Sequence, residues 1–183
     1  MALQWSFLNQ LGSFSFGNNR VMDREVQIEP KESHIGQQVD VDKLETLICL
    51  EAIIVACYQS LAGLVHNQTI RQDCQQFEQQ AQYHQEKLRK IFPLSPKSEL
   101  AIDLKVNHHL LNLKPAYLSL REVIILTINL TTLKTDIYKC FSRTLSEHHE
   151  ILNTLFEENA EEMYFLRQEN NFHQNRLDTF LIV

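Results

Sequence analysis

The chain has 183 residues, 44% of them hydrophobic, and a formal net charge of −6. This length suits one domain with a sizeable core, and the negative charge argues against nucleic-acid binding, because attraction to phosphates requires clustered Lys and Arg. Only four Gly and four Pro occur, and no alternating apolar run is bounded by turn dipeptides. The composition therefore favours helices over sheet.

The first 40 residues differ in character from the rest of the chain. They contain three of the four glycines and no sustained apolar periodicity, so we expect an irregular N-terminal arm over residues 1–40 and a folded domain over residues 41–183. The arm lacks the basic segment and apolar core of a secretory signal. No uninterrupted apolar run reaches the length of a membrane span, which is about 18 residues. We therefore expect a cytoplasmic protein with no membrane segment.

Two amphipathic patterns follow the arm. Apolar residues recur at three- and four-residue steps over residues 42–65 and again over residues 70–91, which predicts a pair of helices joined by a short turn. Each apolar stripe contains one ionisable residue, Glu51 in the first and His84 in the second. A buried carboxylate needs a partner. We expect Glu51 and His84 to hydrogen-bond to each other across the hairpin, or alternatively to hold a metal ion together with water.

Prolines bound a connection of 24 residues over 93–116. This is too long for a hairpin and suits a crossover that runs back along a bundle, with room for a short helix in its middle. Periodicity predicts a third helix over about 118–145 and a fourth over about 146–175. In the fourth helix we place Ala160 and Met163 on the inner face.

The four cysteines fall within helical patterns and lack the C-x-x-C spacing of zinc sites. We expect buried, reduced thiols rather than a zinc site or disulfides. The four are Cys49, Cys57, Cys74 and Cys140.

The two halves of the domain repeat. Residues 52–64 align with residues 132–145 through a shared tyrosine. Residues 77–90 align with residues 156–169 through a shared Phe-Glu-x-x-Ala frame. A helical hairpin therefore occurs twice, and the crossover joins the two copies.

This plan resembles that of ferritin-like bundles, and the first hairpin resembles that of rubrerythrin-like members. The resemblance implies an all-α, up-down bundle of four helices in two hairpins. It also implies a di-iron centre in which helices one and three each give a Glu and helices two and four each give a Glu-x-x-His pair. Carried over, Glu51 fits the carboxylate of helix one and His84 fits the imidazole of helix two.

Four of the six ligand positions implied by the family carry other residues. Ala81 stands three residues before His84, Thr131 takes the position on helix three, and Ala160 and Met163 take the pair on helix four. One carboxylate and one imidazole would leave two iron ions coordinated mostly by water. The sequence therefore predicts a degenerate di-iron site.

Four glutamates crowd the predicted fourth helix, and they are Glu157, Glu158, Glu161 and Glu162. On the surface they would solubilise the helix or meet a cationic partner. If the register of the second hairpin is one residue off, Glu158, Glu161, Glu162 or Asp136 turns inward instead.

No phosphate-binding loop, GxSxG elbow or HExxH motif is present to indicate an enzyme. We predict a non-catalytic protein without a cofactor that acts by association, as a homodimer or with a protein partner. The alternative is a metal-binding oxidoreductase or iron-handling protein with iron or another divalent metal at Glu51 and His84. A third possibility is a small apolar molecule or lipid held in the bundle core beside Ala81 and Ala160.

Overall fold

The computed structural model describes residues 40–180, so the predicted N-terminal arm lies outside it except for Asp40. Side chains are described through residue 173, with the exception of Ser146. Within this part of the chain every regular element is a helix, and the all-α prediction is confirmed. The elements are α2 (Val41–Leu64), α3 (Gln68–Ile91), α4 (Pro96–Leu113), η1 (Pro115–Tyr117), α5 (Leu120–Thr144), η2 (Ser146–His148) and α6 (His149–Phe180), where η marks a 3₁₀ turn.

Side-chain caps explain where four of these helices begin. The side chain of Asp40 caps α2, that of Asn67 caps α3 and that of Ser95 caps α4. Ser119 caps α5 in a capping box, in which Glu122 accepts a hydrogen bond from the Ser119 backbone in return. The caps of α2, α3 and α5 explain why these helices begin within two residues of the starts that periodicity predicted.

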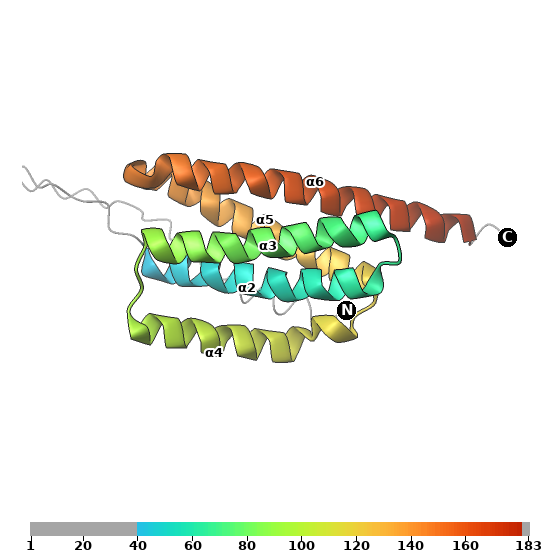
Figure 1. The fold of residues 1–183 in the computed structure, drawn as a ribbon, viewed down its shortest axis with the longest axis horizontal. Helices are drawn as coiled ribbons and strands as arrows, with labels where there is room; N and C mark the ends of the chain where they lie inside the picture. The colour runs from blue at the N-terminus through green and yellow to red at the C-terminus, as the bar shows by residue number, and fades with distance from the viewer. Residues whose placement is uncertain (1–39, 181–183) are drawn as a thin grey trace, which may run out of the picture. The chain divides into compact units, whose positions relative to one another are not determined.

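The helices pack as two hairpins around a shared centre. α2 packs against α3, and α5 packs against α6, while α2 also packs against α5 and joins the two pairs. The predicted crossover carries an 18-residue helix, α4, which is longer than the short helix expected there. α4 packs along α2 at the opposite edge from α6 (Figure 1). The described residues thus form five α-helices, which are the four main helices predicted and α4.

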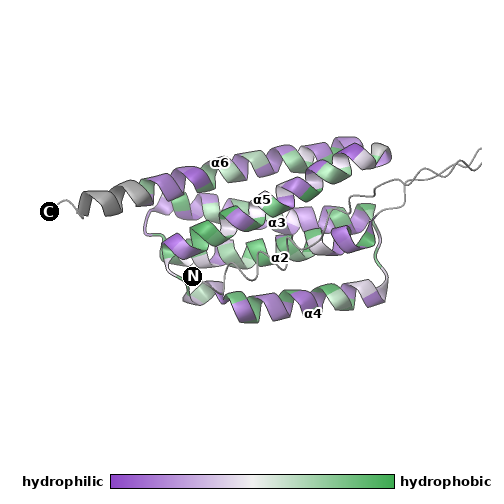
Figure 2. Ribbon diagram, turned by 180° about the vertical axis from the view of Figure 1, so that it is seen from behind, coloured by the Kyte–Doolittle hydropathy of each residue, from purple (hydrophilic) through white to green (hydrophobic). Residues whose placement is uncertain are grey.

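The apolar core lies where the starts of α2 and α6 meet the ends of α3 and α5. Leucine, isoleucine and phenylalanine side chains fill it, each stabilising the fold by about 1.5–3 kcal/mol. Its fully enclosed members include Leu47, Ile48, Leu88 and Leu152. Figure 2 shows apolar residues along α2 and a more polar mixture on the outer helices, as expected for a helix surrounded by others.

α2 is also long and apolar enough to cross a membrane, with a mean hydropathy of 1.9 over an 18-residue window. The other helices of the described region do not meet this test. Within the structure, 56% of that window is buried against other helices. A helix in the centre of a bundle has the same composition, so length and hydropathy alone are weak support for a membrane span, and the expectation of no membrane segment stays a prediction.

Candidate functional site

Glu51 and His84 meet in the centre of the domain, as their positions in the two stripes predicted. Both are buried, and the His84 Nδ1 atom lies 3.0 Å from the Glu51 Oε1 atom. The other ring nitrogen of His84, Nε2, lies 2.7 Å from the Oε2 atom of Glu158 on α6. His84 therefore links α2 to α6 from its place on α3.

Lys134, on α5, lies at the centre of the cluster. Its side chain is fully buried, and its Nζ atom donates to the Glu51 Oε2 atom at 3.1 Å and to the Glu162 Oε2 atom at 2.7 Å. Lysine is almost never fully buried unless it is paired. One ammonium group thus joins carboxylates from α2 and α6, a role that apolar periodicity did not predict for Lys134.

Hydroxyl groups complete the bonding of both buried carboxylates. Tyr138 donates to Glu51 Oε1 at 2.9 Å. Tyr58 and Thr131 each donate to Glu162 Oε1 at 3.0 Å. Tyr58 and Tyr138 are the residues that the sequence repeat aligned, and each binds a carboxylate of the other hairpin. All four carboxylate oxygens of Glu51 and Glu162 therefore accept at least one hydrogen bond.

The electrostatics favour charged groups inside this cluster. Burial alone would raise the pKa of Glu51, but the charge of Lys134 and the hydrogen bonds from His84 and Tyr138 bring it below its usual value. Burial would likewise lower the pKa of Lys134, but the charges of Glu162 and Glu51 bring it above its usual value. Glu51 therefore stays a carboxylate and Lys134 stays an ammonium at neutral pH.

The register predicted for the second hairpin is wrong by one residue. Ala160 is exposed and Met163 is half-buried, whereas Asn159 and Glu162 are buried. The inner face of α6 continues the three- and four-residue steps that begin at its buried leucines, but with polar side chains in the middle. Because Asn159 and Glu162 are polar, apolar periodicity assigned the inner face to the adjacent Ala160 and Met163 instead.

The same error explains why Lys134 was missed on α5. Apolar periodicity selects Leu133 and Ile137 for the inner face of α5, but both are only half-buried. The buried stripe instead passes through Thr131, Lys134 and Tyr138 at steps of three and four. The signal that could have found Lys134 was its place in this stripe, seven residues after Thr127 and seven before Phe141.

The donor set does not fit the di-iron centre that the ferritin-like resemblance implies. The oxygens that would bind a metal already bind Lys134, and its positive charge lies 2.7 Å and 3.1 Å from them. Among the residues with described positions, no group of three or more His, Cys, Asp or Glu side chains has a geometry that could hold a metal ion. The metal role of Glu51 and His84 stays a prediction, and Ala160, being exposed, cannot line a core cavity for an apolar molecule.

The cysteines agree with the sequence prediction of reduced thiols. All four are free, three of them are buried and Cys140 is half-buried. Burial raises the pKa of Cys57 to about 12. These thiols therefore pack as small apolar side chains.

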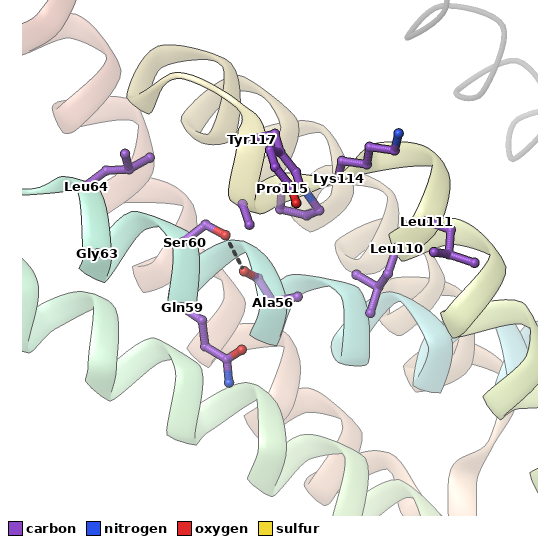
Figure 3. Close-up of a pocket in the computed structure, with 11 residues that line it drawn as sticks. Ala56, Gln59, Ser60, Gly63, Leu64, Leu110, Leu111, Lys114, Pro115 and Tyr117 are labelled. Carbon is purple, nitrogen blue, oxygen red and sulfur yellow. Dashed lines mark hydrogen bonds between the residues drawn. The ribbon is translucent and has the colours of Figure 1, made fainter.

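A second candidate site is an open groove at the surface, drawn in Figure 3. Residues of the C-terminal half of α2, such as Ala56 and Gly63, form one wall, and Leu110, Lys114 and Tyr117 from the end of α4 and from η1 form the other. The groove has a volume of about 1010 Å³ and a mainly apolar lining. A Cβ atom added at Gly63 would meet nothing within 4 Å, so the groove is open there.

The chain matches no protein-family model, no curated protein and no solved structure. The ferritin-like resemblance therefore rests on the residues and helices of this chain alone.

Proposed function

We propose that this protein is a ferritin-like helical bundle that acts by binding further copies of itself rather than by chemistry at a metal. Two helical hairpins, joined by a connection that runs along the bundle as α4, support the ferritin-like plan. In the centre, ammonium, imidazole and hydroxyl groups already bind the carboxylates of Glu51 and Glu162. The outer surface is then the place where a partner binds.

The observation that carries this proposal is an exposed apolar face on α4. Leu100, Leu104 and Leu111 are 60%, 62% and 71% exposed, and their spacing places them on one side of the helix. Tyr117, which follows in η1, is 87% exposed and borders the groove. Contiguous exposed apolar side chains of this kind mark interaction surfaces.

Charge complementarity favours a second copy of the chain as the partner. Lys97 and Lys114 are exposed at the two ends of α4. On α6, at the opposite edge of the bundle, Glu157 and Glu161 are exposed beside Tyr164, which is 66% exposed (Figure 1). α4 of one copy thus offers apolar side chains with positive charges, and α6 of the next offers negative charges with an aromatic ring. This contact is head-to-tail, so it builds rings or open chains.

Charge reversal tests the proposal. One variant combines Lys97→Glu with Lys114→Glu, and a second combines Glu157→Lys with Glu161→Lys. Each variant alone brings like charges together and is expected to weaken self-association at least tenfold, which corresponds to about 1.4 kcal/mol. An equimolar mixture of the two variants restores opposite charges at every contact and is expected to regain the association. Sedimentation velocity over a wide concentration range measures all three samples.

A matched control reverses the charges of Glu86 and Lys90, which are exposed on α3, and is expected to associate as the wild type does. A wild-type protein that stays monomeric at every concentration would refute the proposal. So would a mixture of the two charge-reversed variants that associates no better than either variant alone.

A further inference from the structure

We infer that Lys134 is a built-in cation that occupies a latent divalent-metal site in the bundle core, so that the chain itself blocks metal binding there. The inference concerns the interior of the bundle and is independent of the self-association proposed for its surface. It rests on the geometry around the Nζ atom, on the charges of the two carboxylates that bind it, and on an unpaired amide on the helix that carries one of them.

The geometry around Lys134 is that of a cation site. Its Nζ atom receives carboxylate oxygens from α2 and α6 at 3.1 Å and 2.7 Å, and both carboxylates are almost completely buried. Metal–oxygen bonds to carboxylates are about 2.0–2.2 Å long. The two oxygens would have to close in by only about 0.5–1.1 Å each to bind an ion in place of the amine.

The surrounding groups are the oxygen and nitrogen ligands that divalent transition metals prefer. Besides Glu51 and Glu162, His84 contacts Glu51 directly and binds Glu158 through its second ring nitrogen. Three carboxylates and one imidazole therefore lie within one connected network. Imidazole and carboxylate ligands suit ions such as Zn²⁺, Co²⁺, Mn²⁺ and Fe²⁺. A divalent ion would also replace the positive charge that removal of the lysine takes away.

Asn159 supplies an observation independent of the charged groups. It is 0% exposed and belongs to the buried stripe of α6, next to Glu158 and three residues before Glu162. Neither its Nδ2 atom nor its Oδ1 atom has a hydrogen-bond partner. Buried polar groups are normally paired. The core thus contains an unused oxygen donor on the helix that carries two of the carboxylates.

The test compares two substitutions of Lys134 that differ in the space they leave. Lys134→Ala removes the amine and leaves room for an ion, whereas Lys134→Met removes the charge but fills most of the same volume. With tag-free protein and Co²⁺ as the probe, we expect Lys134→Ala to bind about one ion per chain. We expect the wild type and Lys134→Met to bind none. Elemental analysis after dialysis gives the stoichiometry, and the visible spectrum of Co²⁺ reports its ligands.

Two further variants locate the ion and guard against misfolding. Adding Glu162→Ala to Lys134→Ala is expected to abolish Co²⁺ binding. Lys134→His keeps a group that can carry a positive charge, so this variant is expected to fold without metal and to bind Co²⁺ when it is supplied. Lys139→Ala removes an exposed lysine from the same helix and is expected to leave Co²⁺ binding as in the wild type.

Two results would overturn the inference. The first is stoichiometric Co²⁺ binding by the wild type that is lost on Glu162→Ala, because Lys134 would then not block the site. The second is the absence of bound Co²⁺ in both Lys134→Ala and Lys134→His. If Lys134→Ala folds only when Co²⁺ is present, as followed by circular dichroism with and without chelator, that result supports the inference.

Discussion

Replacement of Lys134 by methionine is expected to destabilise the protein strongly. Methionine fills a similar volume but leaves two buried carboxylates, Glu51 and Glu162, without their shared cation. Removing one partner of a buried ion pair costs about 3–5 kcal/mol. Domains are stable by about 5–15 kcal/mol, and in a chain of this size each kcal/mol shifts the melting temperature by about 2–4 °C. We therefore expect a fall of about 6–20 °C.

The loss of stability in Lys134→Met should depend on pH, and the direction of that dependence follows from the charge of Glu51. In the wild type the pKa of Glu51 is below its usual value, so its contribution is fully present above the unfolded pKa of about 4.3 and is lost only as the pH falls through the lower folded pKa. Without Lys134, burial instead raises the pKa of Glu51, which takes up a proton at higher pH. The difference in unfolding free energy between wild type and variant should therefore shrink between pH 7 and pH 5.

Urea unfolding at both pH values, followed by circular dichroism, measures this difference. Lys139→Met replaces an exposed lysine of the same helix and should change stability by no more than about 0.5 kcal/mol. If Lys134→Met is as stable as the wild type at pH 7, the ion network does not hold the core together. A difference that stays constant or grows on acidification would contradict the charge states assigned to the cluster.

Substitutions of other side chains should have costs that differ with their burial. Glu158→Ala should lower the free energy of unfolding by about 1 kcal/mol or less, because the Glu158 side chain is 34% exposed. Glu51→Ala should lower it by about 3–5 kcal/mol, because Glu51 is fully buried. Both are measured by urea unfolding, and equal losses would contradict the difference in burial. Ser119→Ala removes the capping box of α5 and should cost about 1 kcal/mol, measured in the same way, and no loss would mean that the cap is not formed in solution. In native protein a thiol reagent should modify the half-buried Cys140 first and Cys57 only on unfolding; rapid modification of Cys57 would contradict its burial.

The sequence by itself determined the helices and one pair of the core cluster. Prolines and three- and four-residue spacing are local features, and they indicated the hairpin that brings Glu51 against His84. Both residues interrupt strongly apolar stripes, so their inward direction followed from their neighbours on the same helix. The α4 helix was expected only as a short segment, because its packing against α2 is a tertiary contact.

Only the tertiary structure decided which polar side chains face the centre from the second hairpin. Adjacent positions on a helix point about 100° apart, so an error of one residue exchanged Asn159 and Glu162 for Ala160 and Met163. Lys134 was hidden for a related reason. A lysine is usually solvated, and nothing local shows that two carboxylates from other helices lie within 3.1 Å of its amine. The charge balance of the core depends on contacts between distant segments, and only the folded arrangement supplies them.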